Sequence, residues 1–346
     1  MTVEQTYLEM KRKLADIVPD VELRYKAEIA FQINQLKKEK NAVILGHNYM
    51  EPALYHSIPD FTGDSLGLSR LAAKTDKDII VFCGVRFMAE TAKILNPGKT
   101  VLVPAEKAGC SLAESITAQD VRNLRQRFPG VPVVAYVNTY ADVKAEVDIC
   151  CTSANAAAVV DSFKTDTVIF LPDEYLARNV AQQTGKHIIF PQPMKSSNGS
   201  NDTKLDHQII GWHGRCEVHE KFTTKDIQAI REQFPDVVIL SHPECSPEVV
   251  NASDFSGSTT AMIEYVKQTK APRYLLLTEC AMGDNIAAEN PDKEMLRLCS
   301  VRCPHMNQIT LEDTLKSLQE IRYRVEVPEE IRIRAARSVE RMIAIG

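Results

Sequence analysis

The sequence lacks the features that would direct a chain into a membrane or out of the cell. It holds no apolar run of the roughly 18 residues that a membrane-spanning helix needs. Its first twenty residues contain four acidic side chains and no apolar centre of the kind that a secretory signal peptide has. We therefore expect a cytosolic protein that binds no membrane.

An excess of basic residues is also lacking. The 346 residues include 41 Lys and Arg against 46 Asp and Glu, which gives a net charge of −5. Proteins that bind nucleic acid or anionic lipid carry a basic surface, so we expect neither as a partner. The 44% hydrophobic and 25% charged residues are typical of globular chains, and the length indicates two or three domains.

The nine cysteines include no Cys-x-x-Cys pair, which excludes the usual zinc-ribbon and thioredoxin spacings. A disulfide framework is typical of short secreted chains, whereas this chain is long and is expected in the cytosol. Any cysteines that bind a metal must therefore be brought together by the fold.

Internal repeats organise the chain. Three continuous apolar runs end in polar residues, as buried strands of parallel sheets do, namely Val43–Tyr49, Val133–Thr139 and Val237–Glu244. In each copy a serine (Ser65, Ser153, Ser258) opens a small-residue helical stretch, and a second apolar strand follows (Ile79–Cys83, Thr167–Leu171, Tyr274–Thr278). The intervals align the strand ends at His47, Asn138 and His242. The repeated unit is strand, helix, strand.

One cysteine stands at the same place in each copy. Seven residues after Cys110, Cys216 and Cys303 a Thr-x-x-Asp sequence begins, which is a helix N-cap signature. Third strands precede the first two cysteines, at Val101–Val103 and His187–Phe190. The intervals between copies agree once an insertion of about fifteen residues is placed before Cys216, and we expect polar residues 196–210 to form that loop.

The repeats predict an α/β fold of three pseudo-threefold-related α/β/α sandwich domains, with parallel sheets around a central active site. We predict an N-terminal arm at 1–21, repeats at 22–105, 106–200 and 201–310, and C-terminal helices at 311–346. Ligands of open α/β sheets bind at the carboxyl ends of strands, where we expect the three cysteines to converge. Three thiolates near a threefold axis suit a [4Fe-4S] cluster whose fourth iron lacks a protein ligand and acts as a Lewis acid.

Taken in order, several motifs resemble those of the quinolinate synthase family, iron-sulfur enzymes of NAD biosynthesis. They are Gly46–Tyr49, Gly63–Leu66, Ala108–Ala113, Tyr136–Thr139, Cys151–Asn155, Cys216-x-x-His219, His242–Cys245, Gly257–Thr259 and Cys303-Pro304-x-Met306. The resemblance covers residues 22–310. It implies an enzyme that condenses iminoaspartate with dihydroxyacetone phosphate to quinolinate, with release of phosphate and water. Its [4Fe-4S] cluster would be held by Cys110, Cys216 and Cys303.

The resemblance also implies roles for single residues. Ser153, Ser258 and Thr259 would anchor phosphate or carboxylate groups, which helix N-termini attract. The substrate-orienting residues would be His47, Tyr49, Ser65, Tyr136 and Asn138. Glu244 would be the base, with a pKa raised between the cluster and bound anions, and Tyr49 and His242 would be further catalytic groups that contact substrate.

Two expectations concern partners. The resemblance implies an aspartate-oxidising enzyme that supplies the unstable imine. A homodimer is expected from the general frequency of twofold assemblies.

Other interpretations stay open at this point. The three thiolates with His219 or His305 would suit zinc, or a cluster could serve only as an oxygen sensor. A periplasmic phosphosugar-binding protein would need an export signal. Cys299 could compete with Cys303 for the metal or form a redox pair with it. The cysteines expected to pack in the core are Cys83, Cys150, Cys151, Cys245 and Cys280.

The chain departs from the family pattern at one turn. The family has Gly where Ala281 stands here, so a role for Glu279 stays open.

Overall fold

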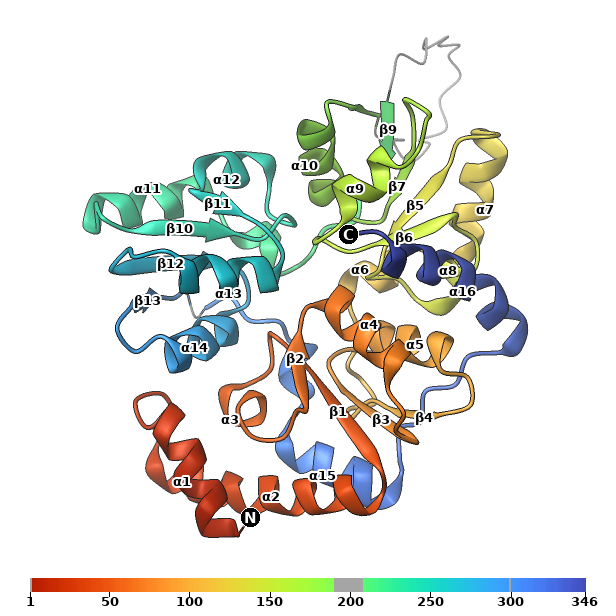
Figure 1. Cartoon of the computed structure of the whole chain (residues 1–346). Coiled ribbons are helices and arrows are strands. Elements are labelled where there is room, and N and C mark those ends of the chain that lie inside the picture. The colour runs from red at the N-terminus through yellow and green to blue at the C-terminus, as the bar shows by residue number, and fades with distance from the viewer. Residues whose placement is uncertain (1, 190–207, 299) are drawn as a thin grey trace.

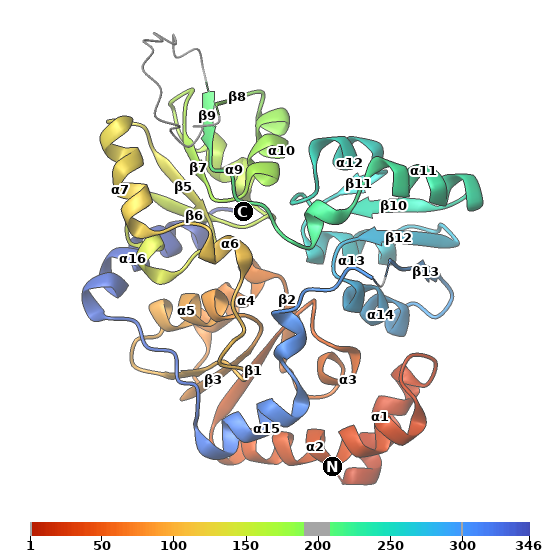
Figure 2. The same ribbon diagram turned by 180° about the vertical axis from the view of Figure 1, so that it is seen from behind.

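The computed structural model describes residues 2–189, 208–298 and 300–346. Within these residues parallel strands form three separate sheets, each flanked by helices (Figure 1). Figures 1 and 2 show the sheets as three lobes around a common centre. The predicted fold class, three α/β sandwiches with parallel sheets, is confirmed.

The first lobe contains the sheet β2-β1-β3-β4. Its strands are β1 (Ala42–His47), β2 (Phe61–Gly63), β3 (Ile79–Cys83) and β4 (Thr100–Leu102), and its helices are α1 (Val3–Leu14), α2 (Asp20–Glu39), α3 (Pro52–Tyr55), α4 (Ser65–Lys74) and α5 (Arg86–Leu95). Strand β1 is buried along its whole length, as its continuous apolar sequence predicts.

The second lobe contains the sheet β6-β5-β7-β9-β8. Its strands are β5 (Val133–Tyr136), β6 (Ile149–Cys151), β7 (Ile169–Leu171), β8 (His187–Ile189) and β9 (Gln208–Gly211), and its helices are α6 (Ser111–Glu114), α7 (Ala118–Arg127), α8 (Ala141–Lys144), α9 (Ala156–Asp161) and α10 (Glu174–Thr184).

The third lobe contains the sheet β11-β10-β12-β13. Its strands are β10 (Val238–Ser241), β11 (Phe255–Ser256), β12 (Arg273–Leu277) and β13 (Glu294–Leu296). Its helices are η1 (His219–Lys221), α11 (Thr224–Gln233), α12 (Pro247–Ala252), α13 (Thr259–Gln268), α14 (Cys280–Glu289) and η2 (Met306–Gln308).

The third strand predicted at His187–Phe190 is present as β8 (His187–Ile189). It lies at the sheet edge, because β9 lies between β8 and β7. Residues 208–210, expected in a loop, belong to β9, and residues 196–207 lie outside the described residues. A strand of four residues is too short for its apolar pattern to stand out in the sequence.

The strand registers align the three lobes residue by residue. In each lobe one residue of the central strand pairs with the last residue of the next strand: Gly46 with Cys83, Ala135 with Leu171, and Ser241 with Leu277. His47, Tyr136 and His242 are therefore equivalent. The predicted alignment of Asn138 with the two histidines is wrong, because the apolar run continues past the end of β5 to Val137.

The predicted helix caps are confirmed. Thr117, Thr223 and Thr310 are the N-cap residues of α7, α11 and α15, and each hydroxyl accepts from the backbone N–H of the aspartate three residues on. The repeated cysteine-to-cap spacing therefore reflects a repeated local structure.

The C-terminal helices return to the first two lobes. Helix α15 (Leu311–Glu320) packs against α2, and α16 (Glu329–Ala344) packs against β6, α8 and α5 (Figure 1). After α16, the carbonyl oxygen of Ile345 accepts from Arg70 Nη2 at 3.2 Å and from Asn155 Nδ2 at 2.8 Å. This single carbonyl joins the first lobe to the second. The repeat boundaries at 105, 200 and 310 stay predictions, although β9 of the second sheet lies beyond residue 200.

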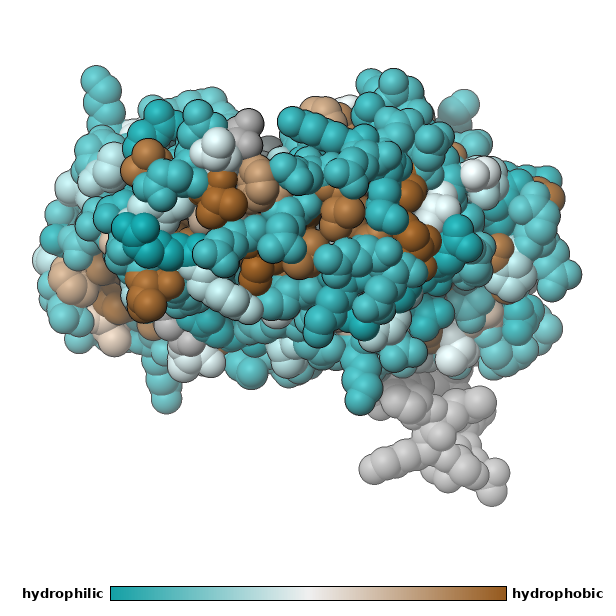
Figure 3. Space-filling view, turned by 90° about the horizontal axis from the view of Figure 1, so that it is seen from below, coloured by the Kyte–Doolittle hydropathy of each residue, from teal (hydrophilic) through white to brown (hydrophobic). Residues whose placement is uncertain are grey.

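No helix in the described parts of the chain is long and apolar enough to cross a membrane. Figure 3 views the molecule from the side on which α1, α2 and α15 lie in Figure 1, and hydrophilic residues cover most of that face. Single exposed apolar residues of the described chain, such as Val21 and Tyr25 on α2, are ordinary for a protein surface.

Candidate functional site

The carboxyl ends of the central strands face one cavity between the three lobes. Three predicted ligands and nine predicted substrate or catalytic residues line it: Cys110, Cys216, Cys303, His47, Tyr49, Ser65, Tyr136, Asn138, Ser153, His242, Glu244 and Thr259. Ser258 instead lines the adjoining cavity. The fold therefore brings together residues that are far apart in the sequence.

The three cysteines reach the cavity from equivalent turns. Each thiol is free, and its sulfur accepts from the backbone N–H groups two and three residues on; the donors are Leu112 and Ala113, Val218 and His219, and His305 and Met306. Burial raises the pKa of Cys110 to about 12 and that of Cys303 to about 11, while these N–H groups act in the opposite direction. Three soft sulfur donors with N–H groups aimed at them fit a thiolate-bound metal centre.

A second set of donors overlaps the first. Cys216, His219 and Glu244 each offer one ligand atom, and these atoms lie within 4.8 Å of one another. The cavity therefore contains a possible metal-binding group.

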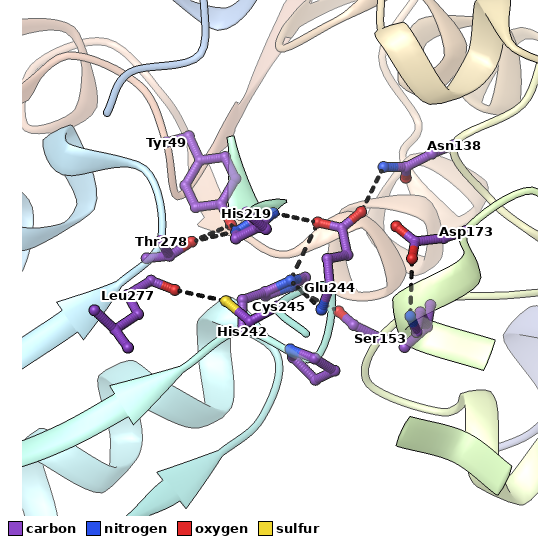
Figure 4. Close-up of polar contacts among 12 residues, drawn as sticks. Tyr49, Asn138, Ser153, Asp173, His219, His242, Glu244, Cys245, Leu277 and Thr278 are labelled. Carbon is purple, nitrogen blue, oxygen red and sulfur yellow. Dashed lines mark hydrogen bonds and ion pairs between the residues drawn. The ribbon is translucent and has the colours of Figure 1, made fainter. Parts of the chain in front are cut away.

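Glu244 is the centre of the polar network in Figure 4. Its Oε2 lies 2.8 Å from His219 Nδ1 and 3.1 Å from His242 Nδ1, and its Oε1 accepts from Asn138 Nδ2 at 3.4 Å. The imidazole rings of His219 and His242 stack with centroids 4.6 Å apart. Burial raises the pKa of Glu244, but the two imidazoles lower it by more, and the net shift is downward. The raised pKa predicted for Glu244 concerned a site that holds a cluster and bound anions, and it stays a prediction.

Tyr49 is held beside this network. Its hydroxyl lies 2.6 Å from Thr278 Oγ1, which in turn lies 3.0 Å from His219 Nε2 (Figure 4). Burial raises the pKa of Tyr49 and of Tyr136 well above the usual value, so both phenols are neutral at physiological pH. Burial also lowers the pKa of His47 to about 4. His47 Nδ1 accepts from the backbone N–H of Tyr49 at 3.3 Å, which leaves the proton on Nε2.

The serines differ in how they meet the helix ends. Ser258 caps α13 and donates to Asp64 Oδ2 at 3.0 Å, while Asp64 itself caps α4, whose first residue is Ser65. Ser153 does not begin a helix as predicted, because Asn155 takes the cap position of α9. The Ser153 hydroxyl lies 3.2 Å from His242 Nε2, across the boundary between the second and third lobes.

Sequence comparison identifies the family. The sequence model of quinolinate synthetase A protein matches residues 31–344. The chain belongs to this family.

Relatives of almost equal length agree. Quinolinate synthase 2 of Mesorhizobium japonicum is 50% identical over 344 residues, which cover 99% of each chain. Quinolinate synthase of Sinorhizobium fredii is 51% identical over 96% of this chain and 86% of its own. Quinolinate synthase of Xylella fastidiosa is 52% identical over 90% of this chain and 86% of its own. The cavity is therefore that of an enzyme of the quinolinate synthetase A family.

The sequence pattern did not indicate a catalytic or substrate-binding role for several residues in and beside this site. His219 stands in the quoted Cys-x-x-His spacing but was considered only as a zinc ligand. Thr278 and Asp173 follow β12 and β7, so their places after strand ends could have indicated them. The buried Asp173 carboxyl caps α10 through Oδ1, and Oδ2 has no hydrogen-bond partner among the residues that the structure describes.

The turn of the third lobe that has Ala281 in place of the family's Gly retains Glu279. Glu279 is fully buried, and burial raises its pKa to about 7. Of the predicted packing cysteines, Cys83, Cys150, Cys151 and Cys245 are buried free thiols. The expectation for Cys280 is incomplete, because this buried cysteine is disulfide-bonded. Cys299 lies outside the described residues.

Proposed function

We propose that this enzyme condenses iminoaspartate with dihydroxyacetone phosphate to quinolinate, with release of phosphate and water, as a step of NAD biosynthesis. The observation that carries the proposal is the joint lining of one cavity by three free cysteines and the Glu244 network. Membership of the quinolinate synthetase A family supports the same activity.

Cys110, Cys216 and Cys303 would hold a [4Fe-4S] cluster. The fit rests on three thiols in one cavity, each accepting from two backbone N–H groups. When bound, the cluster would supply a Lewis acid through the iron that has no protein ligand.

The substrates' anionic groups would bind where helices begin. Thr259 is the first residue of α13 and Ser65 is the first residue of α4, so unpaired backbone N–H groups lie at both places. The Ser153 hydroxyl adds a donor from the second lobe, and Ser258 would contribute by keeping the α13 end in place. The neutral phenols of Tyr49 and Tyr136 would orient substrate by donating hydrogen bonds.

Glu244 would act as the base. Both imidazoles contact Oε2, whereas Oε1 has only the long contact with Asn138, so Oε1 is the oxygen that would accept a substrate proton. The downward pKa shift keeps the carboxylate ionised and ready to accept a proton at neutral pH. His242 and His219 would hold the carboxylate in place while the proton is transferred.

The proposal is tested with protein purified without oxygen, by iron and sulfide analysis and by assaying quinolinate from the two substrates. We expect wild type to form quinolinate and Cys110→Ser to lose iron. Glu244→Gln should keep its iron and lose activity by about 100-fold or more, because general-base catalysis is typically worth that much. Zinc in place of iron, or a Glu244→Gln enzyme as active as wild type, would contradict the proposal.

We further propose that the enzyme works in the cytosol as a homodimer and receives the imine from an aspartate-oxidising enzyme. Free imines hydrolyse in water, which supports a coupled supply. An assay in which that enzyme generates the imine in the same vessel should give more quinolinate than addition of preformed imine.

A further inference from the structure

In each lobe, one side chain donates hydrogen bonds to the two backbone carbonyl groups that flank a residue of the cavity. We call this pair of hydrogen bonds a bracket. The bracketed residues are Tyr49, Asn138 and Glu244, which follow His47, Tyr136 and His242. On both sides of each one, the backbone carbonyl groups accept hydrogen bonds from the same donor. The three lobes therefore share one kind of contact beside the cavity.

In the first lobe the donor comes from the third lobe. Asn285 of α14 donates through Nδ2 to the carbonyl oxygens of Asn48 at 3.2 Å and Met50 at 2.9 Å, which flank Tyr49. Asn285 is buried, and among the described residues its Oδ1 has no hydrogen-bond partner. Its side chain therefore bonds, within that part of the chain, to the Tyr49 turn.

In the third lobe the donor comes from the second lobe. Asn179 of α10 donates through Nδ2 to the carbonyl oxygens of Pro243 at 2.8 Å and Cys245 at 2.9 Å, which flank Glu244. Its Oδ1 is likewise buried and has no hydrogen-bond partner in the described parts of the chain. Asn179 and Asn285 stand at the same place in their helices, five residues after the first residue of α10 and of α14.

In the second lobe a buried lysine replaces the asparagine. Lys144 of α8 donates through Nζ to the carbonyl oxygens of Val137 at 2.9 Å and of Thr139, which flank Asn138. The first lobe supports this side chain from α5, since the ammonium lies 5.6 Å from the centre of the Phe87 ring. The bracket is thus present in all three lobes, with a different donor in one.

The brackets add to hydrogen bonds that the strand-end turns make within themselves. Within the first turn the backbone N–H of Met50 donates to His47 at 3.0 Å, and Cys245 donates to His242 at 2.9 Å in the third. A donor that binds the carbonyls before and after one residue fixes both of its peptide planes. Those planes set the direction of its side chain.

We propose that Asn285 and Asn179 are positioning residues that aim Tyr49 and Glu244 into the cavity from the neighbouring lobes, and that Lys144 does so for Asn138. The catalytic importance of this aim rests on the proposed function. A misplacement of about 1 Å in a catalytic group costs about 100-fold in rate.

The first test measures amide hydrogen exchange in the turns at 46–51 and 241–246 of the whole protein. Asn285→Ala should speed exchange about tenfold in the first turn and leave the second unchanged, and Asn179→Ala should do the reverse. The matched control is Asn290→Ala at the C-cap of α14, because the buried Asn290 side chain donates to the carbonyl oxygen of Ile286 in that helix and not to a strand-end turn. If alanine prevents folding, serine at either place is tested for the same crossed pattern.

The second test is kinetic. Each asparagine variant should lower kcat for quinolinate formation at least tenfold while KM changes less than about threefold, and Asn290→Ala should leave both unchanged. An equal change of exchange in both turns, or none in either, would overturn the inference. If wild type forms no quinolinate, the proposed function fails, whereas the exchange pattern still decides whether the brackets hold the turns.

Discussion

At the scale of single residues, Asp173 is a carboxyl group removed from water. It is fully buried at the end of β7 and faces Glu244 in Figure 4. Burial raises its pKa well above the usual value, and the charges of Glu244 and Glu174 act in the same direction. The folded protein therefore keeps a proton on Asp173 at a pH where the unfolded chain has released it.

Asp173→Asn should stabilise the protein in a pH-dependent manner. The unfolded carboxyl loses its proton near pH 4, so stability falls as pH rises from there towards the folded pKa, by about 1.4 kcal/mol per unit. Asparagine keeps the cap on Leu176 and does not titrate. Urea unfolding should show the variant more stable than wild type at pH 7 and equal to it below about pH 4. A difference independent of pH would contradict this account.

Much of the site could be predicted at this scale. Residues such as His47 and Cys110 follow strands or repeat at fixed spacing, so the local sequence pattern predicts their positions. His219 lies in one segment and Glu244 follows a strand in another, so their contact depends on how the fold brings the two segments together. The spacing of residues along the chain does not predict that contact. The direction of the Glu244 pKa shift followed from that contact and so was not predictable.

At the scale of secondary structure, the caps provide the clearest test. Thr223→Ala should lower the free energy of unfolding by about 1 kcal/mol, because it removes the hydroxyl that accepts from Asp226 at the start of α11. Thr223→Ser should restore most of the loss. Since Thr223 does not line the cavity, kcat should be unchanged in both, and a change in kcat would contradict the assignment of a purely structural role.

The strands and helices of the repeats could be predicted because each is decided by a few neighbouring residues. Strand β1 is a continuous apolar run, and α11 has its cap and its apolar face within ten residues. Strand β9 and the partners of α16 could not be predicted in this way. Their positions depend on which surface of a distant lobe remains uncovered, which a local pattern does not contain.

At the scale of the whole molecule, the chain after α16 ties two lobes together. Arg70 donates to the carbonyl oxygens of Ile343 and Gly346 at 3.0 and 2.7 Å as well as to that of Ile345. Arg70→Ala should lower the free energy of unfolding by about 1 to 2 kcal/mol, because it removes hydrogen bonds donated by a partly exposed charged group. Lys74→Ala, an exposed position on the same helix, is the control.

A single unfolding transition is expected in both wild type and Arg70→Ala. The two asparagine brackets, the Ile345 carbonyl and the α15 packing cross between lobes, so one lobe cannot open without exposing polar groups of the next. Two separate transitions in calorimetry of the wild type would show that the lobes unfold independently.

The brackets of Lys144 and of the two asparagines should form at different stages of folding. The turn that carries Asn138 is bracketed from within its own lobe and can form as soon as that lobe folds. The turns that carry Tyr49 and Glu244 gain their brackets only when neighbouring lobes dock. During refolding, catalytic activity should therefore return after secondary structure. Chains whose lobes have not yet docked should be inactive.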